Sequence, residues 1–248
     1  MRMKRAFTLV ELLVVIGIIA LLISVLLPAL NKAQQQAKKI ACQSNLRMMG
    51  QALAIYTNDT KYYPGAQAWS KSGGDPIACW PTRLRKSMKA GRDAFNCPAQ
   101  DPAFRWQLVL GSGAGFATPD DVGYGYDPGE KTLSVFTTKF HYGYNDWGYH
   151  DPTSSNIDHE LKAARVKKST EMIAIADVGQ FADWHLNLDP RDPNQYPGNV
   201  HNNGANVLFC DGHVAWFLIE EITDAGVAKM TASQYTNMKR LWNNDNEP

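Results

Sequence analysis

The longest run of apolar positions extends from Phe7 to Leu30, and the short basic segment MRMKRA precedes it. As an α-helix rising about 1.5 Å per residue, this run would be roughly 36 Å long. It could therefore cross the hydrocarbon core of a bilayer with some tilt, whereas the apolar core of a secretory signal peptide is shorter. Basic residues ahead of a span favour the cytoplasmic side. The pattern predicts a single-pass membrane helix with a cytoplasmic N-terminus and all later residues outside.

An amphipathic pattern follows directly after this run. Apolar side chains recur at alternating intervals of four and three residues, which corresponds to one stripe of a helix. They are Cys42, Leu46, Met49, Leu53 and Tyr56. No turn signal separates residues 7–30 from residues 31–60, so we expect one continuous helix with a membrane-spanning half and an amphipathic half. Pro28 lies inside this helix and removes one backbone hydrogen bond, which should kink or loosen it.

Residues 61–248 have the composition of a loop-rich β domain, because most of the 19 Gly, 13 Pro and 10 Tyr of the chain lie there. The apolar run at residues 171–178 predicts a buried strand. Residues 205–219 contain two β-prone runs divided by Asp211-Gly212, which predicts a hairpin with a type I′ turn. The expected fold class is α+β, with a long N-terminal helix and an antiparallel sheet.

Charge and motif content argue against several functions. The chain has 25 basic and 24 acidic residues, so no strong field favours nucleic acid as a partner. We find no dinucleotide-binding or phosphate-binding loop and no nucleophile elbow. The six histidines do not have the spacing of a zinc protease helix. We therefore expect a protein that is not an enzyme.

The start of the apolar run carries a more specific pattern. Residues 4–11, KRAFTLVE, resemble the processing site of type IV prepilins and type II secretion pseudopilins. In that family a prepilin peptidase cuts just before the Phe and methylates the new amino terminus. The resemblance implies a leader from Met1 to Ala6 and a mature chain that begins at Phe7. Ala6 departs from the usual Gly, but both residues are small, which leaves the position of cleavage unchanged.

Glu11 lies inside the predicted span, where a carboxylate costs about 2.5–3.5 kcal/mol near the helix centre. The resemblance implies that it pairs with the Phe7 amine of a neighbouring subunit and sets subunit register. The alternative is that Glu11, near the helix end, reaches the cytoplasmic interface and has no partner. The resemblance also implies a pilin-like helix packed on the sheet, with Pro28 at the usual place. It implies a subunit held in the inner membrane and a periplasmic or extracellular filament of like subunits, assembled by an ATPase and a platform protein.

Four cysteines, Cys42, Cys79, Cys97 and Cys210, allow three pairings in an oxidising compartment. A bridge between Cys79 and Cys97 would close a short loop. Because Cys42 belongs to the inward stripe of a pilin-like helix, a bridge from Cys42 to Cys97 is favoured. Cys210, in the apolar run VLFC, is the foremost candidate for an unbridged buried thiol.

His201, nine further residues and then Asp211-Gly212 resemble the C-terminal signature of an expanded family of pilin-like proteins. We expect a structural hydrogen bond from His201 to the hairpin turn rather than a metal site. The alternative function for the chain is a membrane-anchored periplasmic binding protein or metal-dependent enzyme that uses His201 and Asp211. That alternative has no further catalytic residues to support it.

We expect no cofactor from the sequence, and calcium is the favoured metal if one binds. Its candidate oxygen ligands precede His201 in a proline-rich loop; they are Asp189, Asp192 and Asn194. The resemblance supports this prediction, because some major pseudopilins bind calcium in a C-terminal loop. The loop does not match an EF-hand, and its prolines could stiffen it without any metal.

Overall fold

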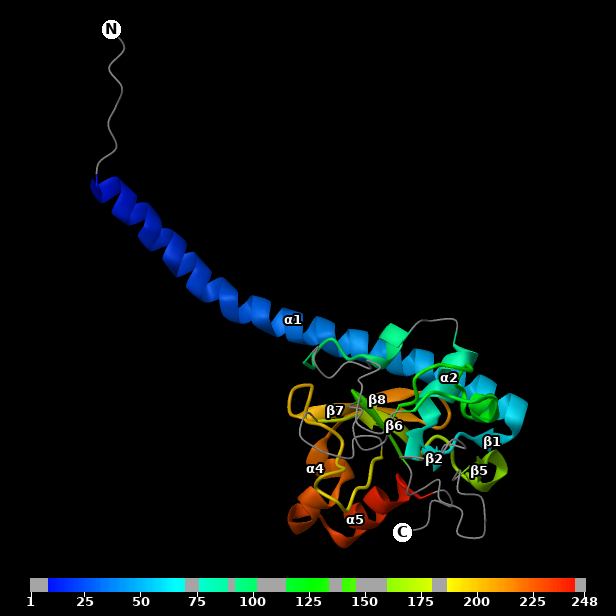
Figure 1. Ribbon diagram of the computed structural model, residues 1–248. Coiled ribbons are helices and arrows are strands. Elements are labelled where there is room, and N and C mark those ends of the chain that lie inside the picture. The colour runs from blue at the N-terminus through cyan, green and yellow to red at the C-terminus, as the bar shows by residue number, and fades with distance from the viewer. Residues whose placement is uncertain are drawn as a thin grey trace. The chain divides into compact units, whose positions relative to one another are not determined.

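The computed structural model describes residues 9–69, 76–88, 92–101, 115–133, 140–145, 160–179 and 187–243. Helix α1 runs from Leu9 to Thr60 and contains Pro28 within its continuous helical span (Figure 1). The chain divides into two units, Met1–Lys38 and Lys39–Pro248. α1 therefore contributes one part to each unit.

The second unit is built around an antiparallel sheet, so the molecule is α+β. Among the described residues, this sheet has four strands in the order β4-β6-β7-β8. Their bounds are Tyr142–Tyr144, Ile173–Asp177, Gly204–Phe209 and Val214–Leu218. β6 and β7 are buried along their whole length, as expected for central strands.

Shorter elements complete the unit. β1 (Tyr62–Tyr63) pairs with β5 (Leu161–Lys162), and β2 (Gln67–Trp69) pairs with β3 (Pro76–Ala78). Helix α2 spans Trp80–Ser87, and 3₁₀ turns cover Arg92–Phe95, Pro119–Tyr124 and Ala163–Arg165. After the sheet come α4 (Ile219–Ile222), η5 (Asp224–Lys229) and α5 (Ala232–Arg240).

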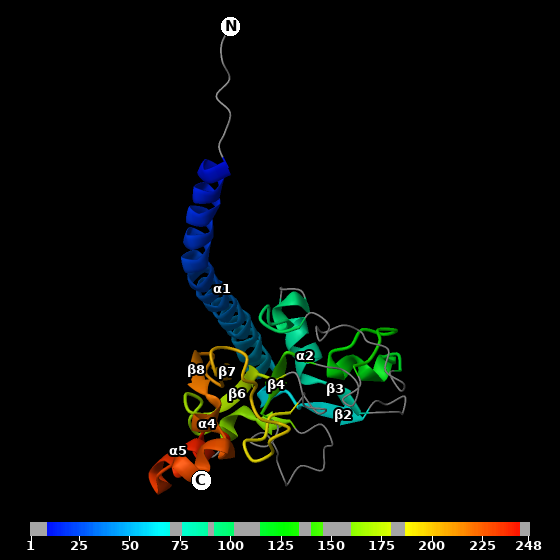
Figure 2. The same ribbon diagram turned by 90° about the vertical axis from the view of Figure 1, so that its left-hand side faces the viewer.

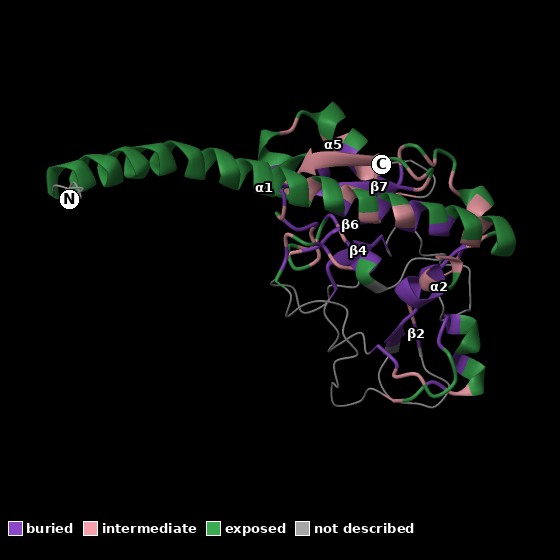
Figure 3. Cartoon of the chain, turned by 90° about the horizontal axis from the view of Figure 1, so that it is seen from above, coloured by how far each residue is buried: buried purple, intermediate pink, exposed green. Residues whose placement is uncertain are grey.

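The amphipathic part of α1 packs on one face of the sheet. Cys42, Leu46, Met49 and Leu53 are buried and share a core with Tyr142, Tyr144, Ile175 and Leu208. Figure 3 shows the alternation of buried and exposed positions along this part of α1. The stripe read from the sequence is therefore the face that the helix buries, with Tyr56 partly buried at its end.

The opposite face of the sheet is covered by the C-terminal helices. Val207 and Phe209 of β7 join a second core with Ile222, Met238 and Trp242. Because side chains alternate along a strand, Asn206 and Leu208 point to the α1 face instead. Figure 2 shows the sheet with α4 and α5 beyond it. The three layers make a helix–sheet–helix arrangement within the second unit.

The hairpin expected at residues 205–219 is formed by β7 and β8, but its turn differs from the prediction. Gly212 has a φ of 93°, whereas Asp211 is not among the residues with positive φ. The Gly212 N–H donates to the carbonyl of Phe209, and Asp211 Oδ1 accepts from the His213 N–H at 3.1 Å. A turn followed by one left-handed residue is the longer hairpin type that contains a glycine bulge. The type I′ prediction was wrong because the turn holds one more residue than that type does.

Candidate functional site

The N-terminal part of α1 is an apolar surface. Side chains from Leu9 to Leu30 are exposed, and the helix is long and apolar enough to cross a membrane. Apolar surface left in water costs about 25 cal/mol per Å². This segment therefore has the length and composition of a membrane anchor.

The residues expected to direct processing and assembly belong to this end of the chain. Ala6 and Phe7 lie outside the described residues. Glu11 lies in the first turn of α1 and is exposed, and the helix continues through Pro28. The carboxylate is thus presented at the start of the apolar helix.

His201, the first residue of the C-terminal motif, is buried in the turn before β7. Its N–H donates to the carbonyl of Gly204, and its own carbonyl accepts from Trp216 Nε1 at 2.8 Å. Its ring nitrogen Nε2 lies 3.4 Å from Cys97 Sγ and 3.5 Å from Asp177 Oδ2. The backbone contacts hold the imidazole at a fixed place beneath α1.

The other half of the motif lies elsewhere, which corrects the predicted bond between His201 and the hairpin turn. Asp211 Oδ1 lies 2.6 Å from Nδ1 of His213, and that ring is nearly half exposed. β7 separates His201 from the turn, and six extended residues cover roughly 20 Å. The nine-residue spacing thus places the two ends of the motif at opposite ends of one strand. An enzyme or binding protein that uses His201 and Asp211 together has no common site here.

Asp177 is the site residue that sequence reasoning missed. It ends β6 and is fully buried. The register opposes it to Tyr142, and Ile175 lies two residues earlier on the same side of β6. This alternation turns its carboxylate toward α1 and His201. The sequence signal that could have identified it is a single acidic residue directly after the apolar run IAIA.

The cysteines join α1 to the domain. Cys42 and Cys97 form a disulfide with a Cα–Cα distance of 5.3 Å, and this is the pairing that the sequence favoured. Cys79 is buried and Cys210 is half-buried, and among the described residues both lie outside that disulfide. The Cys97 N–H donates to Nδ1 of His141 at 3.0 Å, which fixes the segment that carries Cys97.

Burial shifts the titration of the two polar side chains beside the disulfide. It raises the pKa of Asp177 to about 7, and the hydrogen bond from the Asn206 N–H partly offsets this rise. Burial, followed by the positive charge of Lys39, lowers the pKa of His201 to about 4. The imidazole of His201 is therefore neutral at pH 7.

The loop proposed to bind calcium uses its carboxylates internally. Asp189 accepts hydrogen bonds from the Arg191 N–H and guanidinium, with an Nη2–Oδ2 distance of 2.9 Å. Asp192 Oδ1 accepts from the N–H and the amide group of Asn194. An ion that used these oxygens would compete with Arg191, and calcium at this loop stays a prediction.

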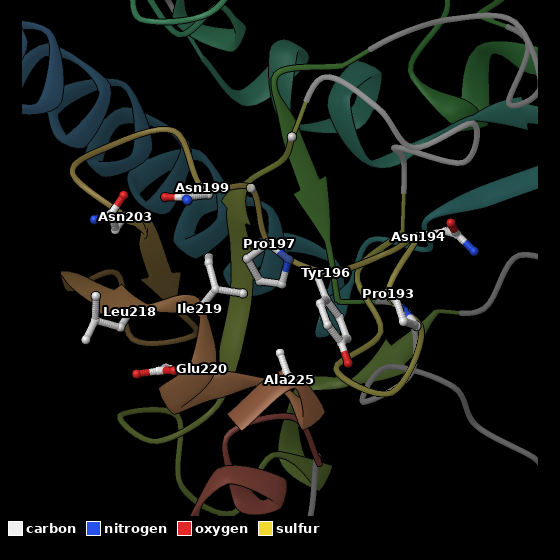
Figure 4. Close-up of a pocket in the computed structure, with 12 residues that line it drawn as sticks. Pro193, Asn194, Tyr196, Pro197, Asn199, Asn203, Leu218, Ile219, Glu220 and Ala225 are labelled. Atoms are coloured by element: carbon white, nitrogen blue, oxygen red, sulfur yellow. The ribbon is translucent and has the colours of Figure 1, made fainter. Parts of the chain in front are cut away.

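The same loop borders a surface pocket of about 670 Å³ (Figure 4). Tyr196 and Pro197 line one side, and Ile219, Glu220 and Ala225 line the other. Glu220 also forms an ion pair with Lys229. The pocket walls therefore combine apolar groups with the polar side chains of Asn194, Asn199 and Asn203.

Comparison with known proteins gives one family match, at the N-terminal end of the chain. The family model for the prokaryotic N-terminal methylation motif matches residues 1–27. Proteins with this motif are typically structural pilin subunits and not enzymes. No curated protein and no solved structure matches the chain. The motif, the long apolar helix and the small antiparallel sheet are together consistent with a type IV pilin-like protein.

Proposed function

We propose that this chain is a structural subunit of a type IV pilus or a type II secretion-like filament. A prepilin peptidase cleaves it between Ala6 and Phe7 and methylates the new amino terminus. The observation that carries the proposal is the methylation motif at residues 1–27, placed directly on a helix with an exposed apolar surface.

The exposed surface of the first part of α1 suits two successive environments. In the bilayer, lipid covers the side chains from Leu9 to Leu30, and the helix satisfies its own backbone hydrogen bonds. In a filament, the same side chains pack against the equivalent helices of other subunits. The membrane-spanning state is then a store from which subunits are withdrawn.

Glu11 sets the axial register in which the apolar helices of neighbouring subunits pack. A carboxylate surrounded by apolar helices is costly unless it is paired. The methylated amine of Phe7 on a neighbouring subunit supplies the opposite charge, and the pair forms only at one axial offset. Glu11 therefore selects one arrangement among the many that a smooth apolar helix would allow.

The remaining chain belongs outside the cytoplasm. Basic residues ahead of the span favour a cytoplasmic leader, and the disulfide between Cys42 and Cys97 favours an oxidising compartment for the domain. The partners are the peptidase, an assembly ATPase, a platform protein in the inner membrane and other pilin-like subunits.

The test compares Glu11→Gln with Ser24→Ala, a second polar position whose hydroxyl bonds to the carbonyl of Leu21 in the same helix. Mass spectrometry of the mature protein should find methylated Phe7 at the amino terminus of both variants. Both should enter the membrane, but Glu11→Gln should be absent from the sheared filament fraction. An intact Met1, or a mature start near Asn31, would overturn the proposal.

A further inference from the structure

Four side chains that can bind metals meet where α1 crosses the sheet. Cys42 comes from α1, Cys97 follows the first 3₁₀ turn, Asp177 ends β6 and His201 precedes β7. One ligand atom from each lies within 4.8 Å of all the others, and all four residues are buried. We refer to these four residues as the buried cluster.

The carboxylate in the buried cluster has an unmet requirement. Asp177 Oδ2 accepts the Asn206 N–H at 2.8 Å, but within the described part of the chain Oδ1 has no hydrogen-bond partner. Leaving a buried polar atom without a partner costs about 1–3 kcal/mol, and more if it is charged. A cation bound at this carboxylate would offset the cost of burying it.

The imidazole of His201 is placed to bind a cation together with the Asp177 carboxylate. Nε2 of His201 faces both Cys97 Sγ and the Asp177 carboxylate. Behind Cys97, Nδ1 of His141 accepts the Cys97 N–H, so its proton lies on Nε2 and points to the carbonyl of Asp101 at 3.3 Å. Supporting contacts of this kind hold metal ligands in place.

The spacing agrees with a tetrahedral zinc site. With Zn–S of about 2.3 Å and Zn–N and Zn–O of about 2.0–2.2 Å, a tetrahedron separates S from N by roughly 3.6 Å and N from O by roughly 3.4 Å. The separations in the structure are 3.4 Å from Cys97 Sγ to His201 Nε2 and 3.5 Å from that nitrogen to Asp177 Oδ2. The other ligand atoms lie within 4.8 Å of one another, and the two sulfurs, which are bonded in the oxidised chain, must part to about 3.8 Å once their bond is broken.

We propose that the thiol form of this chain binds one Zn²⁺ through Cys42, Cys97, Asp177 and His201. A dithiol reductant supplies the two electrons that break the disulfide and is itself oxidised to a disulfide. The two cysteine thiols then release their protons to solvent as the metal binds. Two sulfur ligands favour zinc over calcium or magnesium, which prefer oxygen.

The consequence is that the contact between α1 and the sheet can be closed in two ways. In the oxidised chain the disulfide closes it, and in the reduced chain the metal does. His201, which has no contact with the hairpin turn of its sequence motif, is assigned to this junction.

The experiment uses the full chain in detergent. The protein is reduced with a dithiol in the presence of a chelator, desalted without oxygen and mixed with Zn²⁺ or Co²⁺. Elemental analysis should find about one zinc per chain, as the four-ligand site requires, and cobalt should give thiolate charge-transfer absorption. The oxidised chain should bind neither metal at this site.

Asp177→Asn and His201→Gln should each lower zinc affinity at least about tenfold, because even residues that only support the metal ligands cost about 10–100-fold when they are mutated. The matched control is His213→Gln, because His213 is a partly exposed histidine paired with Asp211 outside the cluster. Disulfide formation and near-UV circular dichroism of each oxidised variant report whether it folds. Zinc binding that is absent from the reduced protein, or unchanged in both cluster variants, would overturn the proposal.

Should reduction loosen the fold, zinc must restore the near-UV signal of the reduced wild-type chain. Zinc that binds without restoring it would show a site on disordered cysteines and would also refute the assignment. The variant Cys210→Ser tests whether the metal binds to the buried cluster or to other cysteines. It removes a thiol outside the cluster and should leave the cobalt spectrum unchanged.

Discussion

Breaking the disulfide between Cys42 and Cys97 should lower the free energy of unfolding substantially. The two residues are 55 positions apart, and the chain-entropy model gives about 4 kcal/mol for a loop of this length. That is a large part of the roughly 5–15 kcal/mol by which domains are stable. Reduction changes no side-chain volume apart from the broken bond, so loop entropy dominates the effect.

The assay is urea unfolding of the full chain in detergent, with and without a dithiol, and with a chelator present throughout. The fluorescence of Trp80 and Trp242 reports unfolding, because both are buried. With a slope of about 3 kcal/mol per molar, the midpoint should fall by roughly 1.3 M on reduction. The double variant Cys42→Ser/Cys97→Ser should begin at the lower midpoint and show no response to the dithiol.

The reasoning fails if reduction leaves the wild-type midpoint unchanged in the presence of the chelator. It also fails if the double variant responds to the dithiol as strongly as the wild type, because the effect would then belong to another cysteine.

Three further predictions test the fold. Leu46→Ala should lower the free energy of unfolding by about 2–5 kcal/mol, because Leu46 is fully buried against the sheet. Ile55→Ala, on the half-exposed side of the same helix, should lower it far less. Equal urea midpoints for the two variants would contradict the assigned helix face. Gly204→Ala should prevent stable folding or shift the hairpin, because a Cβ there would meet the Phe217 carbonyl and the Trp216 ring. Gly123→Ala is the control, because a Cβ there meets nothing within 4 Å. Circular dichroism and thermal melting should show a lower melting temperature for Gly204→Ala alone. Burial, with smaller effects from nearby charges, raises the pKa of Tyr56 to about 12. The free energy of unfolding should therefore fall as the pH rises from about 10 to 12, because the unfolded chain loses the phenol proton first. Tyr56→Phe should weaken this fall, and an unchanged pH profile would argue against the burial of Tyr56.

The sequence by itself determined the features that depend on neighbouring residues. The apolar run and the stripe from Cys42 to Tyr56 both follow from helical periodicity, and the structure contains them as one helix from Leu9 to Thr60. The run IAIAD and the two runs around Asp211-Gly212 likewise contain β6, β7 and β8. The methylation motif is also local, since it occupies residues 1–27.

Only the tertiary structure decided which distant groups meet. The expected bond from His201 to the hairpin turn failed because an extended strand holds the two ends of the motif apart. His201 instead faces Asp177 and Cys97, which lie 24 and 104 positions away along the chain. Such neighbours depend on strand order, register and the seating of α1 on the sheet. Periodicity along one segment carries no information about them, so the helix could be read from the sequence and the buried cluster beneath it could not.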